Sequence, residues 1–323
     1  MGGIRASVII PNWNGAEYLP GCLDSLWDQA APDTEIIVVD NGSTDESMEI
    51  LAKYPGIKVI RNAENRGFAA AVNQGIQAME GCYAVLLNND TVVQRGWLKH
   101  LLREMDTHPE AFSAASLMLR MDDTAIVDDA GDNYTILGWG YKRRDGKPAS
   151  RETKGRNVFS ACGGAAIYRK EILDIIGGMD ETFFAYMEDM DLGWRAQNAG
   201  WVNRYCPEAR VTHIGSATTG SKYNAFKVRL AARNNVLILY KNMPLLTGIL
   251  LSPFLLIGFF VKWLFFAGKG FGGEYCRGFF EAFALFGKLT RRTGGMRRMG
   301  SRLRVLGRMV AGTAEYVVQK ITR

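Results

Sequence analysis

The first 90 residues alternate between short apolar runs and longer segments of helical periodicity, and this alternation constrains the fold more than any other feature. The apolar runs are residues 7–10, 36–39, 57–60 and 83–87. The segments between them, about 16–29, 44–53 and 67–79, repeat apolar residues at helical spacing. Strands and helices that alternate in this way form right-handed βαβ units around a parallel sheet. The sequence therefore predicts a Rossmann-like α/β fold, with a mostly parallel sheet flanked by helices.

The remaining body of the chain is less regular. Residues 112–156 are rich in Asp, Gly and Tyr, and we expect one or two crossing strands and an acceptor-side loop there. Small residues in the run from Gly163 to Arg169 predict a close backbone approach that leads into a helix. The five cysteines are scattered without a CxxC pair, so neither a zinc site nor a disulfide framework is expected, and a reducing compartment fits best. The first residues run directly into a strand-like segment, so we expect no cleavable signal peptide.

Charge divides the chain into two parts. From Lys241 onward there are 14 Lys and Arg residues against 3 Asp and Glu, whereas the preceding residues carry 25 against 30. Composition changes near residues 241–244, so we predict a catalytic domain over 1–240 and a helical, membrane-associating region over 241–323. A strongly basic tail on an acidic body indicates an anionic partner for the tail. Nucleic acid is not expected, because the tail has no base-reading motif or stacking aromatic pattern.

Two segments of the tail have the character of membrane-binding helices. Residues 245–261 carry no charge and approach the length of a spanning helix. Pro253 and Gly258 interrupt this segment, and basic residues flank it on both sides: Lys241 before it, and Arg291, Arg292, Arg297 and Arg298 after it. We therefore favour a re-entrant or interfacial helical pair over a span. Residues 299–321 predict a basic amphipathic helix on anionic lipid, or alternatively a helix packed on the protein body.

Polar side chains follow each of the four predicted strands, where ligands bind in parallel sheets. They lie in residues 11–14, 40–43, 62–67 and 88–90. Asp40 is placed to accept a hydrogen bond from the imino group of a nucleobase. The alternative is that it caps the helix that begins near Thr44, although Ser43 or Thr44 could supply that cap. The run Asn65-Arg66-Gly67 opens the next helix, and it suits an anion or a ribose, or else forms an ordinary turn.

Five further residues, Asp90, His213 and the carboxylates Glu188, Asp189 and Asp191, carry the chemistry of a reaction site. Asp90 ends a buried strand, and one carboxylate with a diphosphate makes a plausible Mg²⁺ or Mn²⁺ site. His213 ends another strand-like run and becomes a candidate ligand if a metal is near; otherwise it is a structural histidine. The carboxylates Glu188, Asp189 and Asp191 crowd together behind the apolar wall of residues 183–186. Such crowding indicates a cation or a proton-transfer role, or alternatively a salt-bridged helix start.

The basic residues shortly after position 220 divide into candidates for ligand contacts and surface residues. Arg229 and Arg233 are candidates for contacts with a diphosphate, whereas we expect Lys222 and Lys227 to be solvated surface residues.

The ordered set of motifs resembles family-2 glycosyltransferases of the GT-A fold, with the greatest similarity to bacterial rhamnosyltransferases. The motifs are Pro11-Asn12-x-Asn14, residues 38–45, Asn65-Arg66-Gly67-Phe68-Ala69, Asn88-Asn89-Asp90, Glu188-Asp189-x-Asp191-Leu192 and His213. Together they cover about residues 7–244, and only the set as a whole is specific.

The resemblance implies a donor site at the strand ends. Asp40 would bind the nucleotide base, and the nucleoside pocket would be lined by Pro11, Asn12, Asn65, Arg66 and Gly67. Asn14, Asn89 and Arg233 complete the implied donor-binding set. Asp90, at the last position of the family's DxD-type motif, would hold a metal on the diphosphate, with His213 as the second ligand. The usual first Asp of that motif is Asn88 here, so this position brings no charge to the metal.

The resemblance also implies the catalytic group. Asp189 would be the general base, and Glu188 and Asp191 would orient the acceptor or Arg195. A single base on the face opposite the leaving group gives inversion, and the metal neutralises the departing diphosphate.

The expected protein is thus an inverting glycosyltransferase that depends on Mg²⁺ or Mn²⁺. It would move L-rhamnose from dTDP-rhamnose, or a sugar from a UDP-sugar, to a lipid-linked saccharide in cell-surface polysaccharide synthesis. We expect it at the cytoplasmic face of the inner or plasma membrane, as a peripheral or monotopic protein. A non-catalytic, membrane-associated sugar-nucleotide-binding protein is the competing class, and the intact Glu188, Asp189 and His213 argue against it. A nucleotidyltransferase is disfavoured, because residues 11–15 lack the glycine-rich, basic loop of such enzymes.

Overall fold

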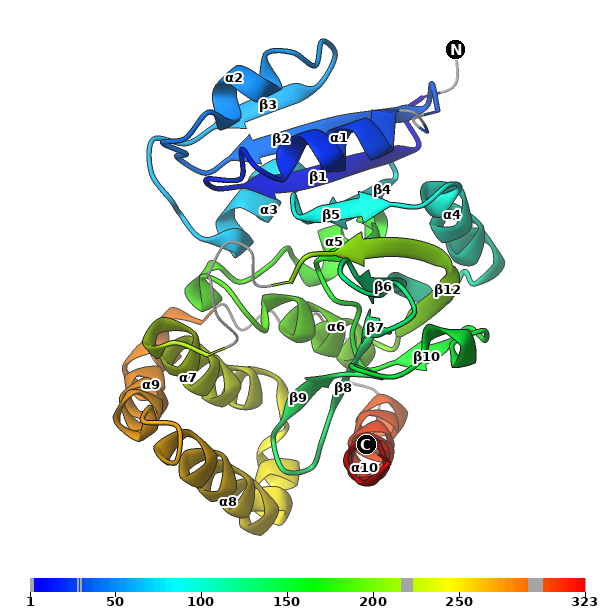
Figure 1. The fold of residues 1–323 in the computed structure, drawn as a ribbon. Coiled ribbons are helices and arrows are strands. Elements are labelled where there is room, and N and C mark those ends of the chain that lie inside the picture. Colours follow the sequence, from blue (N-terminus) through cyan, green and yellow to red (C-terminus); the bar gives the residue numbers. More distant parts are fainter. Residues whose placement is uncertain (1–2, 28, 30, 216–222, 290–298, 323) are drawn as a thin grey trace.

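The computed structural model describes residues 3–27, 29, 31–215, 223–289 and 299–322. The expectations about Lys222 and about the arginines at 291, 292, 297 and 298 lie outside these residues. A ten-stranded mixed sheet runs through the body in the order β10-β12-β6-β11-β4-β1-β2-β3, with β5 paired to β12 and β7 paired to β6, and β8 and β9 form a separate two-stranded sheet. Figure 1 shows the N-terminal strands at one end of the molecule and the C-terminal helices at the other.

The predicted strand–helix alternation is confirmed in the N-terminal half. The strands are β1 (Ala6–Asn12), β2 (Thr34–Asp40), β3 (Lys58–Arg61) and β4 (Tyr83–Leu87), and the helices between them are α1 (Leu19–Trp27), α2 (Ser47–Leu51) and α3 (Phe68–Ala78). β1 pairs in parallel with β2 and with β4, and β2 pairs in parallel with β3. Their carboxyl ends therefore meet at one edge, as the strand-end motifs require.

Both faces of the sheet are covered along β1, β2 and β4, which explains why the middle of each of these strands is apolar, whereas most of edge strand β3 is exposed. Side chains alternate between the two faces along a strand. Val8 and Ile10 accordingly pack with α1 and α4, whereas Ile9 packs with α3 and α5. α3 approaches the sheet closely, because a Cβ atom at Gly75 would lie 2.3 Å from Ile9 Cγ2. The result is a three-layer core with the sheet in the middle.

The second half of the sheet is where the mostly parallel pattern ends. β11 (Ala165–Arg169) runs antiparallel to both β4 and β6 (Ala111–Arg120), and β12 (Val202–His213) runs parallel to β6. The segment from Gly163 to Arg169 leads into a helix as expected, because α5 begins at Lys170; strand β11, which was not predicted, forms most of the segment itself. The remaining elements here are β5 (Thr91–Val93), α4 (Trp97–Thr107), β7 (Val127–Asp129), η1 (Ala149–Arg151), β10 (Arg156–Val158), α5 (Lys170–Ile176), η2 (Glu181–Phe183) and α6 (Glu188–Ala199).

The C-terminal helices share a core with the body. A third apolar cluster joins Tyr134, Phe159 and Trp194 of the body to Leu237 of α7 (Ala225–Asn242) and Met309 of α10 (Met299–Ile321). Around it lie β8 (Asp132–Tyr134), β9 (Gly140–Lys142), α8 (Leu245–Ala267), α9 (Gly272–Leu285) and η4 (Phe286–Lys288). α7 crosses the boundary expected at residue 240, so packing is continuous there and the division into two domains stays a prediction.

α8 and α10 both have one packed and one exposed side. By length and composition α8 could cross a membrane, and most of its most apolar stretch is exposed. α10 packs on the body through Val305 and Met309, and its Glu315 accepts a hydrogen bond from Asn133 of β8. This is the alternative packing that we considered for α10. Its apolar side chains at Leu303, Val310, Val317, Val318 and Ile321 remain exposed.

Candidate active site

The ends of β1 and β2 bring the first two polar motifs together. Asn12 and Asp40 are register partners, and Asn12 Nδ2 donates to Asp40 Oδ1 at 3.0 Å. Asp40 is fully buried, and its other oxygen accepts from the Ser43 N–H at 3.2 Å. The side chain of Asp45, rather than Ser43 or Thr44, accepts the Ser47 N–H at the start of α2. Asp40 is therefore not a helix cap, and its base-binding role stays a prediction.

The loop after β1 is tied to the end of β4. Asn89 Nδ2 donates to Asn12 Oδ1 at 2.7 Å, and Asn14 Oδ1 accepts the Thr44 N–H at 2.8 Å. Gly15 permits this contact, since a Cβ atom there would lie 2.0 Å from Asn89 Nδ2. Pro11 occupies β1 directly before Asn12. The structure thus gathers these predicted donor-site residues at one strand edge, together with Gly15, which sequence reasoning did not select.

Asn41, at the end of β2, holds the turn of residues 65–67 against the end of that strand. Its Nδ2 donates to Asn65 Oδ1 at 3.0 Å and to the Gly67 carbonyl at 3.1 Å. Its Oδ1 accepts the Arg66 N–H at 3.1 Å. The Arg66 side chain is exposed and free of these backbone constraints. Asn41 was not among the predicted site residues, although its position next to Asp40 at a strand end was a usable signal.

Gly67 brings the segment before α6 against the start of α3. Its φ of +88° favours glycine, and a Cβ atom would lie 2.7 Å from the Phe184 carbonyl oxygen. Phe184, Tyr186 and Met187 also have positive φ angles, of 63°, 69° and 71°, a strained arrangement of the kind that clusters at functional sites. Phe183 is fully buried, whereas Tyr186 is exposed. The predicted aromatic wall is thus a strained loop in which the Phe183 ring is buried, the Phe184 ring is partly buried and the Tyr186 ring is exposed.

Arg233 and Asn234 of α7 hold this loop in place. Arg233 Nη2 donates to the Phe183 carbonyl at 2.8 Å, and Asn234 Nδ2 donates to the carbonyls of Ala185 and Tyr186 at 2.8 and 2.7 Å. Arg229 pairs instead with Glu281 at 2.8 Å. The structure therefore ties Arg233 to the loop before α6; its contact with a diphosphate stays a prediction. Lys227 is partly buried, less solvated than expected.

Asp90 and His213 meet across β5 and β12. His213 Nε2 lies 3.4 Å from Asp90 Oδ1, and both side chains are largely buried. Asp90 Oδ1 has no hydrogen-bond partner among the described residues. On the other edge of the ring, His213 Nδ1 lies 2.8 Å from Asp128 Oδ2. Burial alone would lower the pKa of His213, but the hydrogen bond to Asp128 and the nearby negative charge of Asp90 raise that pKa to about 9.

Asp128 was not among the site residues predicted from the sequence. It lies in β7, far along the chain from both Asp90 and His213, and also pairs with Lys142 of β9 at 2.8 Å. The only local signal was its place in the Asp128-Asp129 pair directly after Ile126 and Val127.

The carboxylates at the start of α6 have separate environments. Asp189 Oδ2 accepts the Gly163 N–H at 2.8 Å, and its Oδ1 accepts the Met190 N–H at 2.7 Å. Burial raises the pKa of Asp189 against the effect of these donors. Burial and the adjacent Asp189 charge raise the pKa of Glu188 well above its usual range. Glu188 Oε2 has no hydrogen-bond partner in the part of the chain that the structure describes.

Asp191 points away into a buried ionic cluster. It contacts Arg195 Nε at 2.9 Å, Lys241 Nζ at 2.9 Å and Asn242 Nδ2 at 2.7 Å. Although burial alone would raise the pKa of Asp191, Arg195 and Lys241 hold it below its usual value. Asp191 is fully buried, so of its two predicted roles the contact with Arg195 is present in the structure.

The turn at Gly163 and Gly164 joins the two halves of the site. Gly163 donates to Asp189, and the carbonyl of Gly164 accepts the Asn88 N–H at 2.8 Å. A Cβ atom at Gly164 would lie 3.3 Å from Asn88 Nδ2. The carboxylate of Asp189 is therefore placed beside the strand end that carries Asp90.

A second group of possible ligand atoms lies close to Asp189. Single atoms of Asp129, Asp132 and Cys162 fall within 4.8 Å of one another, and burial raises the pKa of Asp129 to about 7. The positive charge of Lys142 acts on both aspartates. Because burial raises the pKa of both aspartates and so favours their uncharged forms, and because a thiol is a poor ligand for hard cations, Asp90 and His213 are the better cation site.

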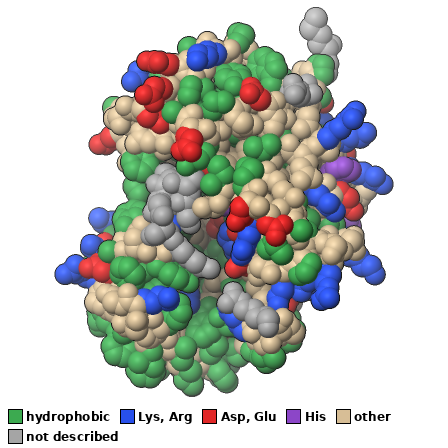
Figure 2. All heavy atoms as spheres, viewed as in Figure 1, with side chains coloured by type: hydrophobic (Ala, Val, Ile, Leu, Met, Phe, Trp, Pro, Cys, Tyr) green, Lys and Arg blue, Asp and Glu red, His purple; other side chains and the backbone are tan. Residues whose placement is uncertain are grey.

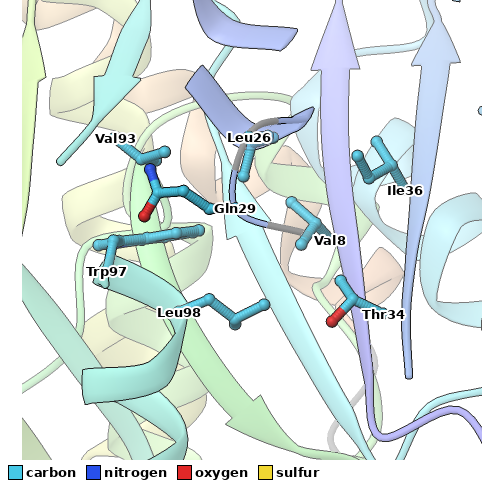
Figure 3. Close-up of a pocket in the computed structure, with 8 residues that line it drawn as sticks. All are labelled: Val8, Leu26, Gln29, Thr34, Ile36, Val93, Trp97 and Leu98. Carbon is cyan, nitrogen blue, oxygen red and sulfur yellow. The ribbon is translucent and has the colours of Figure 1, made fainter. Parts of the chain in front are cut away.

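Figure 3 shows a pocket away from these groups. It lies between α1, α4 and the strands β1 and β2, and is lined by Val8, Leu26, Gln29, Thr34, Ile36, Val93, Trp97 and Leu98. Its lining is mainly apolar and contains no ionisable side chain, so it contributes nothing to the site at the strand ends.

Comparison with known proteins gives a consistent family. The family described as Glycosyl transferase family 2 matches residues 7–177. The chain is 27% identical over 237 residues to the N-acetylglucosaminyl-diphospho-decaprenol L-rhamnosyltransferase of Mycobacterium tuberculosis, covering 66% of this chain and 77% of the relative. It is 30% identical over 209 residues to the pre-mycofactocin glycosyltransferase of the same organism, covering 64% of this chain and 42% of that relative.

Solved structures share the fold at low identity. A structure of GalNAc-T7 with UDP, GalNAc and Mn²⁺ superposes with a TM-score of 0.61 and 19% identity, covering 74% of this chain and 48% of that one. The mannosyltransferase PcManGT from Pyrobaculum calidifontis, in complex with GDP-Man and Mn²⁺, superposes with a TM-score of 0.54 and 16% identity, covering 99% of this chain and 88% of that one. This chain thus spans about half the length of the GalNAc-T7 chain.

Proposed function

The chain belongs to glycosyl transferase family 2 and has the GT-A fold, and on this premise we propose that it transfers L-rhamnose from a nucleoside diphosphate donor to a lipid-linked saccharide, with inversion. The observation that carries the proposal is the Gly163–Gly164 turn, which touches Asp189 on one side and the Asn88–Asp90 strand end on the other. The proposed base and the proposed diphosphate site would thereby be adjacent. The sugar and the lipid-linked acceptor are proposed from the named activity of the mycobacterial relative.

The donor nucleoside is proposed to lie along the ends of β1, β2 and β3. Asp40 would accept a hydrogen bond from the base, and the turn at Asn65, Arg66 and Gly67 would line the ribose. Interlocked asparagines support this assignment, because Asn12 holds the Asp40 side chain and Asn41 holds the Gly67 backbone in place. Such preorganisation lowers the entropic cost of binding. Arg66 is the exposed cation of this group and is suited to a phosphate.

Asp90 and His213 are proposed to hold a Mg²⁺ or Mn²⁺ ion. The buried, unpartnered Asp90 Oδ1, facing His213 Nε2 at 3.4 Å, fits a cation that takes oxygen and imidazole ligands. A buried carboxylate oxygen without a partner is costly, and a bound cation removes that cost. When present, such an ion supplies Lewis-acid neutralisation of the departing diphosphate.

Asp189 is proposed as the general base. It accepts the proton of the acceptor hydroxyl while that oxygen bonds to the anomeric carbon and the bond from this carbon to the diphosphate oxygen breaks. Attack on the face opposite the diphosphate inverts the anomeric configuration. The raised pKa of Asp189 makes it a stronger base than an ordinary aspartate. Asp191 and Arg233 support α6 and the loop before it through the contacts described above, and Glu188 is proposed to orient the acceptor.

The membrane surface is the proposed partner of α8. The inner side of α8 is held on the body, where Trp139 Nε1 donates to the Gly258 carbonyl at 3.0 Å and Leu251, Leu255 and Phe259 pack on the third apolar cluster. The outer side exposes Leu245, Leu246, Ile249, Leu250, Phe254, Leu256, Ile257, Phe260, Val261, Leu264 and Phe265. Figure 2 shows hydrophobic side chains gathered at the end of the molecule where Figure 1 places α8.

A helix with one long side on the protein suits an orientation in the plane of the membrane better than a span. We therefore propose a monotopic protein on the cytoplasmic face of the membrane, with residues 1–240 catalytic and 241–323 docking. The basic excess of that second part favours anionic lipid.

The test is release of nucleoside diphosphate from a panel of dTDP-, UDP- and GDP-sugars, with Mg²⁺, Mn²⁺ or chelator and with lipid-linked saccharide acceptors. We expect metal-dependent, acceptor-dependent release from dTDP-rhamnose in the wild type, and loss of the metal dependence of donor binding in Asp90→Ala. Release from a UDP-sugar alone would overturn the donor but keep the mechanism. Full activity in chelator would overturn the metal site.

A further inference from the structure

We propose that Asp128 is a positioning residue that turns the His213 ring so that Nε2 is presented to the cation beside Asp90. This inference deepens the proposed function and rests on it, since it concerns the cation that Asp90 and His213 are proposed to hold.

The backbone of His213 is fixed, so the orientation of its ring depends on rotation about the side-chain bonds. His213 pairs with Thr91 of β5 and with Arg120 of β6, and its carbonyl accepts the Met121 N–H at 3.0 Å. These bonds anchor the main chain on both sides of β12. A ring on such a backbone can still rotate about its side-chain bonds, and an unrestrained ring presents Nε2 to Asp90 only part of the time.

Asp128 removes that freedom from the opposite edge of the ring. His213 Nδ1 lies 2.8 Å from Asp128 Oδ2, and Nε2 lies 3.4 Å from Asp90 Oδ1. The two ring nitrogens point in divergent directions. A cation bound at Nε2 beside Asp90 is therefore out of reach of Asp128, which contacts only Nδ1. A histidine that binds a metal through one nitrogen commonly donates the N–H of the other to a carboxylate, which sets its tautomer and orientation. Asp128 has this position.

Lys142 stabilises the ionised form of Asp128, the form that accepts a hydrogen bond from His213. Lys142 Nζ lies 2.8 Å from the same Oδ2 atom, and Asp128 is itself largely buried. An oxygen that faces an ammonium group at this distance suits an ionised carboxylate, which accepts the Nδ1–H when His213 is neutral, as a metal-binding imidazole must be.

Binding of Mn²⁺ in the presence of dTDP or UDP tests the inference. We expect Asp128→Ala to weaken Mn²⁺ binding about ten- to a hundredfold, as loss of such an outer partner commonly does. Asp128→Asn retains a carbonyl acceptor for Nδ1–H and should recover part of the loss. Asp145→Asn is the matched control, because Asp145 forms a partly exposed ion pair with Arg120 at 2.9 Å and does not touch His213; it should bind Mn²⁺ as the wild type does.

A spectroscopic readout separates positioning from general destabilisation. The chain has only 3 histidines, so ¹⁵N-imidazole spectra with Mg²⁺ and nucleotide can follow His213 alone, assigned by comparison with His213→Gln. The wild type should show a proton on Nδ1, and a folded Asp128→Ala should lose that single tautomer. Wild-type Mn²⁺ binding that a folded Asp128→Ala retains at full strength would overturn this inference alone. Nucleotide binding by the wild type that is independent of both metals would overturn the metal site and this inference together.

Discussion

At the scale of the residue, two neighbouring carboxylates of α6 lie in different environments and have opposite pKa shifts. Asp189 and Asp191 are two positions apart, so a helix places them on nearly opposite sides. Asp189 faces the Gly163 turn with a raised pKa, whereas Asp191 faces Arg195 and Lys241 with a lowered one. The crowded acidic segment therefore combines a candidate proton acceptor with a salt-bridged helix start, the two readings that its sequence allowed.

The first prediction concerns Asp189 as the base. Asp189→Asn should reduce the rate of transfer about a hundred- to ten-thousandfold and leave the Kd for the donor within severalfold of the wild type. In the wild type, kcat should fall as the pH drops through the raised pKa of Asp189, at a higher pH than for an ordinary aspartate, because the base acts only when deprotonated. Steady-state kinetics across pH and donor titration measure both effects. An active Asp189→Asn enzyme would reject the assignment.

The second prediction concerns the buried cluster around Lys241. Lys241 Nζ lies 2.7 Å from Asp180 Oδ2 and 2.9 Å from Asp191 Oδ2. Lys241→Met removes the cation and leaves buried carboxylates with fewer partners, so the free energy of unfolding should fall by about 3–5 kcal/mol. Urea unfolding measures the loss.

Arg277→Met is its control, because Arg277 pairs with Glu274 at 2.8 Å on the surface; the cost there should be about 0–1 kcal/mol. Equal losses in the two variants would mean that the Lys241 cluster is not a stabilising one.

At the scale of the element, small residues decide how α8 meets the body. A Cβ atom at Gly258 would lie 2.0 Å from the Leu137 carbonyl oxygen, in the turn between β8 and β9. Backbone meets backbone here, so no side chain can yield to make room. Gly248, in the same helix, has its nearest neighbour at 3.7 Å, on the Met243 sulfur. One helix thus contains a glycine that close packing requires and another that it does not.

The third prediction follows from that pair. Gly258→Ala should lower the free energy of unfolding by about 1–3 kcal/mol through overpacking and increase protease cleavage between β8 and β9. Gly248→Ala should be neutral or stabilising by up to about 1 kcal/mol, because alanine is the better helix former. Denaturant unfolding and limited proteolysis of both variants provide the measurement. The reverse order of stability would contradict the packing of α8 on the hairpin.

At the scale of the whole molecule, the proposed reaction site and the apolar side of α8 lie on one continuously packed body. The third apolar cluster links α6, which carries Asp189, to α7, α9 and α10. α9 in turn packs on α8. A membrane under α8 would therefore set the height and orientation of the strand ends above the lipid, where a lipid-linked acceptor is confined.

The fourth prediction is binding to anionic vesicles through α8. The double variant Leu250→Glu/Ile257→Glu should reduce co-flotation with phosphatidylglycerol vesicles about tenfold or more, because two exposed apolar side chains become charged. Ile175→Glu on α5 is the control, since Ile175 is equally exposed but lies on a different helix. Flotation and circular dichroism measure binding and folding. Unchanged flotation of a folded double variant would exclude α8 as the docking surface.

The sequence by itself determined the N-terminal half of the fold and the position of its polar strand ends. Strand and helix periodicities are local, and the carboxyl ends of β1, β2 and β4 must meet at one edge of a parallel sheet. Asp40, Asp90 and Asn65 could therefore be selected as site candidates before any coordinates. Their joint occurrence with Asp189 and His213 was sufficient to identify the family that comparison later showed.

Only the tertiary structure decided which distant residues share an environment. The antiparallel insertion of β11 brings Gly163 between Asp189 and Asn88, and the pairing of β7 with β6 brings Asp128 to His213. Asp191 and Lys241 also meet only after folding. Pairings across such sequence separations leave no periodic pattern, because they depend on how strands and helices pack rather than on local propensity. For the same reason, the sequence alone did not determine which side of α8 is exposed or which side of α10 packs on the body.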